Sequence, residues 1–377
     1  MSTVKANTYQ DASGGSNAVF SGVASPPNSM GFRNRIINGD MRISQAQAGA
    51  SISVSTDPSP RNFPVDRFFC SASGGGVYTA QRSTTAPAGF TNSLILTVTT
   101  ADSSIAAGDV YYMCQAIEGF NVADLGWGSA SAQTITLSFW VRSSIAGTYS
   151  GALRNNAVNR AYAFSYTINA ANTFEYKTVT ITGDTSGTWT TDNSCGIFVD
   201  WDLGSGTNFN GTANAWSAGN FLRNSSGTNW IGTNGATFYI TGVQLEAGTV
   251  ASPFERRDYG RELIMCQRYY EKSFALATAP VTNAGINTGE FIAAANTTIG
   301  NSYTGNVFFK VTKRAAPTIT LFNRANASNN WQWYTSAGGV TNGGVSGNSN
   351  ENGFYAELQG SSTATVAIGH WTASIEL

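Results

Sequence analysis

The sequence predicts an all-β protein with an N-terminal arm, a jelly-roll β-sandwich, a short linking helix and a second, smaller C-terminal β-domain. Only 11% of the residues are charged, and Asn, Ser, Thr and Gly supply most of the polar groups. Ser, Thr and Asn compete with the helix backbone for hydrogen bonds, so this composition favours strands and tight turns. Short alternating runs separated by turn-rich loops are the second observation, because they are typical of antiparallel β-folds.

The first segment, residues 1–33, is small and polar and carries the sequence SPPN at 25–28. Such a segment cannot bury enough apolar surface to fold alone. It is therefore predicted to be an arm that becomes ordered only against a partner.

The second segment, residues 34–251, contains several strand-like runs and no helical pattern between them. Within one of these runs Ile135, Leu137 and Phe139 share one face of the predicted strand, and hydroxyl-bearing residues share the other. The predicted strands lie at 93–100, 133–144, 161–168, 174–182 and 196–204. Runs of this kind indicate an antiparallel sandwich or jelly roll.

The third segment, residues 252–273, concentrates charge, with nine charged residues among the eighteen from Glu255 to Lys272. It is predicted to form a helix over about 259–271 with Asp258 as its N-cap. The apolar stripe of this helix consists of Tyr259, Leu263, Cys266 and Tyr270. Either the stripe packs on its own domain, or copies from several chains meet along it as a coiled-coil-like neck between the two β-domains.

The fourth segment, residues 274–377, returns to β-character. Strand-like runs occupy 306–323 and 363–377, and an Asn- and Gly-rich stretch between them carries Trp331 and Trp333. Its length of about 100 residues suits a second, smaller β-domain.

Charge and hydropathy exclude several classes of partner. The formal net charge is −1, which leaves no electrostatic footprint for nucleic acid or for an anionic membrane. No apolar run has the length of a membrane span, and the N-terminus lacks the apolar core of a secretion signal.

Four widely spaced cysteines without a CxxC pair are expected to be reduced and buried. We expect synthesis in a cytoplasm, no membrane insertion, no cofactor and no metal.

Several long motifs occur in a fixed order along the chain. They are FRNRIINGDMRISQ, DRFF, LSFWVRSS, ATFYITGVQLEAG, SPFERRDYGRELIMCQRYYEKS and, near the end, KVTKRAAPTITLFN and GHWTASIEL. With these motifs the sequence resembles a family of bacteriophage virion structural proteins described as tail-fibre or carbohydrate-binding-module-like, common in cyanophages and other marine phages. The resemblance extends from Phe32 to Leu377.

The resemblance implies a jelly roll for 34–251, a homotrimer, attachment to other virion proteins through residues 1–33, and contact with host cell-surface polysaccharide. The expected function is that of a tail-fibre subunit, made in the host cytoplasm and displayed on the virion. A capsid decoration or head-fibre protein is the alternative within the same class. A glycan depolymerase is the alternative from another class.

Candidate glycan-binding residues are tryptophans in polar surroundings. Loop 203–236 offers Trp216, Trp230 and Asn220 as one group, and in the second domain Trp331 and Trp333 face the same side of a predicted strand. The alternative for the loop is packing between subunits, where Trp and Tyr are also enriched.

Candidate catalytic groups are few. The single histidine, His370, lies in a predicted strand beside Trp371, where a structural role is expected. Asp200 and Asp202 share one face of a predicted strand, so they form either an acid pair, a cation site or a solvated edge. The chain is predicted not to be an enzyme.

A structural calcium of the kind found in carbohydrate-binding jelly rolls would involve Asp40 and the region of Glu246. Arg42 follows Asp40 two residues later, and an arginine is a poor neighbour for a bound cation. Calcium also requires six to eight oxygen ligands, which the sequence does not display, so no metal site is predicted.

Overall fold

The computed structural model describes residues 32–55, 61–294, 302–327, 329–335, 340–346, 348–359 and 364–377. Residues 1–31 of the predicted arm lie outside this part of the chain. The described residues form many β-strands, three short 3-10 helices and a single α-helix. The all-β prediction is confirmed.

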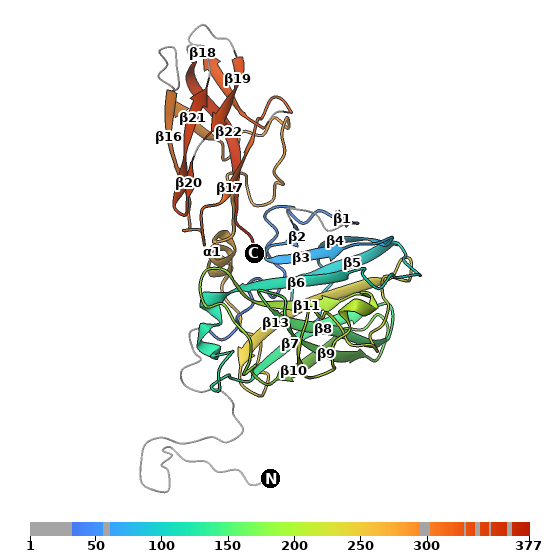
Figure 1. Cartoon of the computed structure of the whole chain (residues 1–377). Coiled ribbons are helices and arrows are strands. Elements are labelled where there is room, and N and C mark those ends of the chain that lie inside the picture. The colour runs from blue at the N-terminus through green and yellow to red at the C-terminus, as the bar shows by residue number, and fades with distance from the viewer. Residues whose placement is uncertain are drawn as a thin grey trace, which may run out of the picture.

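Two antiparallel sheets pack face to face in the larger body of the molecule (Figure 1). The first sheet contains, in spatial order, β1 (Ile52–Val54), β4 (Val77–Ser83), β5 (Ser93–Thr100), β13 (Thr237–Ala247), β7 (Ile135–Ser143) and β10 (Glu175–Ile181). The second contains β12 (Trp216–Ala218), β9 (Arg160–Ile168), β8 (Gly147–Asn155), β11 (Cys195–Asp202), β6 (Tyr111–Glu118), β3 (Phe68–Ala72) and β2 (Asn62–Val65). Three 3-10 helices, η2 (Gly119–Asn121), η3 (Ala123–Leu125) and η4 (Thr207–Phe209), lie in the connections.

The core of this sandwich follows from the alternation in the sequence. Ile135, Leu137 and Phe139 of β7 are fully buried between the two sheets, as their shared face predicted. Phe139 meets Trp201 of β11 edge to face, with ring centroids 5.7 Å apart. Burial of one such side chain contributes about 1.5–3 kcal/mol. Because many apolar side chains are buried between the two sheets, the sandwich has a sizeable core of its own.

Helix α1 spans Tyr259–Gln267, shorter than the predicted range. Its N-cap is Asp258, whose side chain accepts a hydrogen bond of 2.9 Å from the backbone N–H of Arg261, and this prediction is confirmed. Leu263 and Cys266 pack on Ile37 and Ile43 of the same chain.

The predicted stripe is therefore not one continuous helical face. Tyr270 lies beyond the helix in strand β14 (Tyr270–Lys272), because the helix ends at Gln267, and Tyr259 is 44% exposed. The inner half of the stripe, Leu263 and Cys266, is covered by the chain itself, which supports the alternative of packing on the protein's own β-structure.

Charges around α1 pair with distant parts of the chain. The guanidinium of Arg268 donates 2.8 and 2.5 Å hydrogen bonds to Glu118 of β6. Glu271 pairs at 2.7 Å with Lys313, and both side chains are fully buried. The charge of this segment attaches it to the two β-structures on either side.

A third, C-terminal sheet contains in order β14, β22 (Ala364–Ser374), β18 (Trp331–Thr335), β19 (Val340–Ser346), β21 (Gly353–Gln359) and β16 (Ser302–Phe308). Strands β15 (Phe291–Ala294) and β17 (Thr318–Phe322) also pair with β22, and β20 (Ser349–Asn350) pairs with β21. Trp331, Phe354 and Trp371 form the centre of its core. Gly369 of β22 permits this packing, because a Cβ there would lie 2.0 Å from the ring of Trp331.

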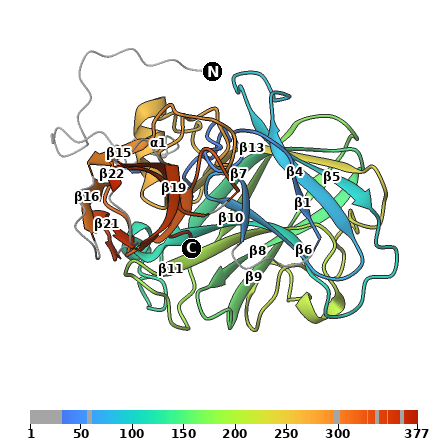
Figure 2. The same ribbon diagram turned by 90° about the horizontal axis from the view of Figure 1, so that it is seen from above.

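Reciprocal contacts join the C-terminal sheet to the sandwich. The side-chain amide of Asn193 donates to the carbonyl of Arg314 at 2.7 Å, and the Arg314 guanidinium donates back to the Asn193 carbonyl at 3.1 Å. Arg67 of the sandwich pairs with Glu376, just after β22. Viewed from above, the C-terminal strands stand over one side of the sandwich (Figure 2).

All four cysteines are free and buried, as predicted. Within the described residues, no helix combines the length and the hydropathy needed to cross a membrane.

Candidate functional site between the sandwich and the C-terminal sheet

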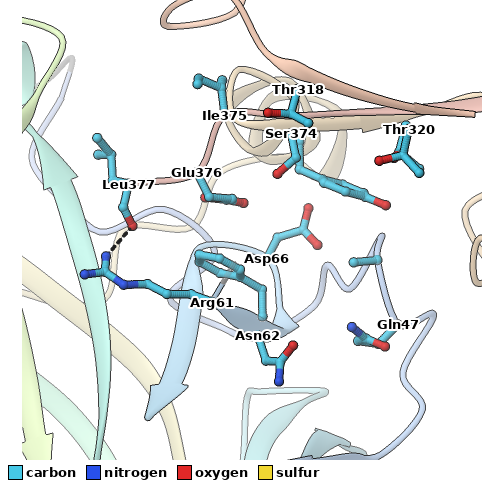
Figure 3. Close-up of a pocket in the computed structure, with 14 residues that line it drawn as sticks. Gln47, Arg61, Asn62, Asp66, Thr318, Thr320, Ser374, Ile375, Glu376 and Leu377 are labelled. Atoms are coloured by element: carbon cyan, nitrogen blue, oxygen red, sulfur yellow. Dashed lines mark hydrogen bonds between the residues drawn. The ribbon is translucent and has the colours of Figure 1, made fainter. Parts of the chain in front are cut away.

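A groove of about 820 Å³ lies between the sandwich and the C-terminal sheet. Figure 3 shows Thr318, Thr320 and Ser374 on one side of it and Asn62 and Gln47 on the other. The first three belong to the C-terminal sheet, and the last two belong to the sandwich side. The groove thus exists only because the two β-structures lie against each other.

Four hydroxyl side chains line the C-terminal wall. Thr318 of β17 lies opposite Ser374 of β22, and Thr320 lies opposite Thr372. Alternate residues of a strand point to one face, and directly opposed Cβ atoms lie about 4.5–5.5 Å apart. Among the described residues, no hydrogen-bond partner is found for the hydroxyls of Thr318, Thr320 and Ser374. The wall therefore presents a two-by-two array of hydroxyls that is largely uncommitted.

The sandwich wall adds amides and aromatic surface. The side-chain amides of Gln47 and Asn62 have no partner among the described residues. The rings of Phe63 and, from β14, Tyr270 also line the groove, and both residues are half-buried. Polar groups beside ring surface suit a ligand with hydroxyls and small apolar faces.

Two buried carboxyls lie at the floor of the groove. Asp66 accepts 2.6 and 2.5 Å hydrogen bonds from the backbone N–H and the side-chain amide of Gln45. Glu376 pairs with Arg67, whose guanidinium lies 3.6 Å from the ring centroid of Tyr269. Burial raises the pKa of Glu376 to about 7 and also raises the pKa of Asp66. Around neutral pH, Glu376 therefore carries only part of a negative charge.

A cation also lines the groove. Arg61 donates a 2.8 Å hydrogen bond to the main-chain oxygen of Leu377, which is drawn as the dashed line in Figure 3. The Arg61 guanidinium carbon lies 4.3 Å from the centroid of the Phe69 ring. The main-chain oxygen of Leu377 and the Phe69 ring together hold this guanidinium at the wall.

An unsatisfied acceptor lies beside the floor. The side chain of Gln45 is buried, and its amide nitrogen donates to Asp66 and, at 3.0 Å, to the carbonyl of Tyr270. Its Oε1 atom has no partner among the described residues. A buried acceptor without a donor costs about 1–3 kcal/mol, and such groups are normally satisfied by the protein or by water.

The predicted glycan residue Trp216 lies in a different place. It packs edge to face with Trp127 and Trp189, with centroid distances of 5.3 Å to each, and those two rings are 4.8 Å apart. We call Trp127, Trp189 and Trp216 the tryptophan cluster. The cluster packs against the sandwich core near β10 and β12, the edge strands of the two sheets. Its three indole N–H groups donate to acceptors of the chain itself.

The other loop candidates are separated from Trp216. Trp230 is fully buried and packs on Tyr78 and Phe238 in the sandwich core, which corrects its assignment to a glycan surface, because both ring faces are inaccessible. Asn220 is exposed and accepts a 2.7 Å hydrogen bond from Arg154. The structure does not bring the three predicted residues together.

The C-terminal sheet contains the other two candidate glycan-binding residues, Trp331 and Trp333. Trp331 is fully buried, its indole N–H donates to the carbonyl of His370 at 2.9 Å, and its ring packs on Phe291. This burial corrects its assignment as a sugar platform. The side chain of Trp333 lies outside the described part of the structure, so its candidacy stays a prediction.

The groove residues were missed by sequence reasoning. The signal available was the alternation of hydroxyls in PTITLF and HWTAS, which places Thr318 with Thr320 and Thr372 with Ser374. The opposition of these two runs and their proximity to Gln47 depend on packing across distant parts of the chain.

The single histidine has a structural environment. Its Nδ1 atom lies 2.9 Å from the hydroxyl of Ser273 and its Nε2 atom 3.2 Å from the carbonyl of Ile286. The ring stacks on Phe274 with centroids 3.9 Å apart, and burial lowers the pKa of His370. The serine hydroxyl is itself bonded to the backbone of Trp371. These contacts hold strand β22 beside the chain at Ser273.

The two aspartates of β11 that were considered as an acid pair or a cation site both have arginine partners. Both oxygens of Asp200 accept from Arg154 at 2.8 Å, and Asp202 lies 3.6 Å from Arg223. The two aspartates are buried on an interior strand between β8 and β6, so the solvated-edge alternative is wrong.

The residues considered for calcium also have partners. Asp40 pairs with Arg42 at 2.5 Å, and Glu246 accepts from Ser252 and Gln244. No group of three or more His, Cys, Asp or Glu side chains within the described ranges is arranged to hold a metal ion.

Comparisons with known proteins were made for sequence and for structure. No protein-family model matches the chain, and no curated protein sequence does. A putative sugar binding protein from Bacteroides thetaiotaomicron is similar over 57% of this chain and 100% of its own, with 12% identity and a TM-score of 0.34. The enzymatically active domain of tailspike protein 4 from bacteriophage CBA120 is similar over 57% of this chain, with 12% identity and a TM-score of 0.28.

A third similar structure is a family 11 carbohydrate-binding module from Clostridium thermocellum, in complex with a mixed-linked tetrasaccharide. It shares 14% identity over 49% of this chain and 91% of its own, with a TM-score of 0.27. The chain spans 21% of the length of the tailspike domain.

Proposed function

We propose that the chain is a structural subunit of a bacteriophage fibre that binds glycans of the host surface in the groove between its sandwich and its C-terminal sheet. The observation that carries this proposal is the set of hydroxyl and amide groups in the groove that have no partner among the described residues. Thr318 is exposed and Gln47, Asn62, Thr320 and Ser374 are half-buried, so a ligand can reach these donors and acceptors, and a group of them beside aromatic rings fits a polar ligand.

The sequence resemblance supports the same assignment. The ordered motifs, from FRNRIINGDMRISQ to GHWTASIEL, resemble phage virion proteins that contact host glycans. Two of the motifs, KVTKRAAPTITLFN and GHWTASIEL, contain the groove residues Thr318, Thr320, Thr372 and Ser374. The part of the chain that resembles those proteins is thus also the part that forms the C-terminal wall.

In this proposal the fibre is a homotrimer that is attached to other virion proteins through residues 1–33. Copies meet along the outer face of α1, where Tyr259 and Ile264 are 44% and 54% exposed, since the inner face already packs on the chain. Light scattering on the full chain checks the assembly: a mass three times that of the chain is expected, and a monomer would contradict the trimer.

The attachment of the arm and the place on the particle need a second test. Phage carrying the gene without residues 1–33 are expected to lack the protein in purified particles. Immunogold labelling of intact particles separates a tail fibre from the alternative of a capsid decoration or head fibre, since the label lies on the tail in the first case and on the shell in the second.

A blocked groove tests glycan attachment. Replacement of Thr320 by Trp fills the space between the two walls, and we expect adsorption of the protein to host cells to be abolished. Thr178, an exposed threonine of β10 outside the groove, supplies the matched control Thr178→Trp. Equal adsorption by both variants would contradict a role of the groove in attachment.

Binding without cleavage is expected. In the described residues, Asp200, Asp202 and His370 all have structural partners within the chain. Incubation with host polysaccharide should produce no new reducing ends, and their appearance would favour a depolymerase.

A further inference from the structure

The polar groups of the groove fall into two sets. Those that carry formal charge have partners inside the protein, whereas those without a partner among the described residues are neutral. This division concerns the chemical class of the ligand, and it rests on the proposed function that the groove binds a glycan.

The charged set consists of Arg61, Asp66 and Glu376. Arg61 is held by the main-chain oxygen of Leu377 and the Phe69 ring. Both oxygens of Asp66 accept from Gln45, and Glu376 pairs with Arg67 behind the groove floor. An arginine that recognises an anion uses its paired N–H donors in a fork, and one Nη of Arg61 is already used on the main-chain oxygen of Leu377.

The neutral set consists of Thr318, Thr320, Ser374, Gln47 and Asn62. The hydroxyls can each donate one hydrogen bond and accept two, and each amide both donates and accepts. On the C-terminal wall the hydroxyls repeat across the paired strands β17 and β22 and again along each strand (Figure 3). A ligand matching this set needs closely spaced groups that donate and accept in turn, as sugar hydroxyls do.

We propose that the groove selects neutral, hydroxyl-rich oligosaccharides and rejects acidic ones such as uronate or sulfated chains. A sugar bearing an anion would approach the carboxyls Asp66 and Glu376, and the one cation in the groove lining, Arg61, already binds the main-chain oxygen of Leu377 and the Phe69 ring. Burial of a charge that lacks a partner is costly. A neutral sugar loses only hydrogen bonds to water and replaces them with those of the array.

Aromatic rings are the second component of the proposed site, after the hydroxyl and amide groups. Phe63 and Tyr270 line the groove beside the hydroxyl array and are half-buried. The apolar C–H face of a pyranose ring suits such surface, and its equatorial hydroxyls then extend toward polar walls. Selectivity in this geometry arises from the spacing of hydroxyls and not from long-range electrostatics.

The experiment measures binding of the full-length protein to immobilised polysaccharides at low and at high NaCl. The neutral panel contains dextran, laminarin, a galactan, a mannan and neutral polysaccharide extracted from the host. The acidic panel contains alginate, hyaluronan, dextran sulfate and the host's acidic polysaccharide. We expect binding to at least one neutral polymer with an affinity that high salt leaves nearly unchanged, because uncharged contacts are not screened.

Variants test whether the array is responsible. Thr318→Val and Thr320→Val remove a hydroxyl while keeping branched side chains that suit a strand. Each is expected to weaken binding to the neutral polymer about tenfold, which corresponds to one good hydrogen bond. Thr178→Val on β10 is the matched control and should bind as the unaltered protein does. Thermal unfolding of all three variants identifies any loss that arises from misfolding.

The outcomes separate the inference from the function on which it rests. Preferential binding of acidic polymers that is lost at high salt and in Thr320→Trp would overturn the inference while leaving the groove as a glycan site. Binding to neutral polymers that persists in Thr318→Val, Thr320→Val and Thr320→Trp would overturn both, because the site would lie elsewhere. No binding to either panel, with normal host adsorption by Thr320→Trp, would also overturn both.

Discussion

The tryptophan cluster of the sandwich and the groove beside the C-terminal sheet both contain groups typical of sugar-binding sites. In the cluster, the indole N–H groups of Trp127, Trp189 and Trp216 all donate to acceptors of the protein, and the rings pack on one another. In the groove, Thr318 and Gln47 have no partner among the described residues.

The difference shows that residue types alone are a poor guide to a binding site. Whether the polar groups already have hydrogen-bond partners within the protein is a better guide. A tryptophan in an Asn-rich loop is noticed in a sequence, yet here it closes the edge of a sandwich. A threonine in a strand is inconspicuous, yet here it faces open space with an uncommitted hydroxyl. Stability and binding are therefore expected to depend on different residues.

The largest expected effect concerns the junction that forms the groove floor. Above about pH 7, where Glu376 is ionised, replacement of Arg67 by Met leaves this largely covered carboxylate without its cation, and loss of one partner from a buried ion pair costs about 3–5 kcal/mol. Urea unfolding should show this loss. The double variant Arg67→Met with Glu376→Gln should recover part of it, and a single variant as stable as the original would show that the pair does not hold the junction.

The tryptophan cluster is expected to contribute to folding and not to attachment. Truncation of Trp216 to Ala should cost roughly 2–3 kcal/mol, less than for a fully buried Trp, because the ring is only half-buried. Thr212→Ala in the same loop is exposed and should have little effect. Glycan binding by the folded fraction should be unchanged, and a selective loss of binding would move the site to the cluster.

The junction should also respond to pH. Burial raises the pKa of Glu376 from its ordinary value of 4.5 to about 7, so the folded protein holds a proton that the unfolded chain has released. The resulting stabilisation is fully present below about pH 4.5 and is lost as pH rises to about 7. Asp66, whose pKa burial also raises, acts in the same direction.

Unfolding at a series of pH values measures how steeply the free energy of unfolding changes with pH. Glu376→Gln should flatten it, whereas Glu351→Gln, at an exposed glutamate, should not. A slope that is the same in both variants would mean that other groups determine the pH dependence.

The smallest change in stability is expected in the groove wall itself. Gln47→Ala removes an amide that has no partner among the described residues, so the free energy of unfolding should stay within about 0.5 kcal/mol. Glycan binding should nevertheless weaken several-fold. An unchanged affinity would remove Gln47 from the site and would narrow it to the hydroxyl array.

Much of the fold was predictable because its signals are local. The alternation of Ile135, Leu137 and Phe139 predicted a buried strand face, and Asp258 predicted the start of α1. The end of the helix was predicted less well, because the stripe continues in sequence through Tyr270 after the chain has turned into a strand. The assembly of the helix into a neck stays a prediction.

The candidate site was not predictable in the same way. Trp230 and Trp331 matched the composition of a sugar-binding surface, and both became core residues because each ring found apolar neighbours from remote strands. Whether a tryptophan is covered depends on what packs on it, and the local sequence does not contain that information.

The sequence by itself determined part of the secondary structure: the two-residue period of strands such as β7 and the N-cap of α1 are properties of neighbouring residues. Only the tertiary structure decided which polar groups are committed. Arg67 and Glu376 are 309 positions apart, yet their pairing occupies the charges at the groove floor. Hydrogen bonds and ion pairs form between groups that packing brings together, so the groups left free for a ligand are known only when the whole chain has folded.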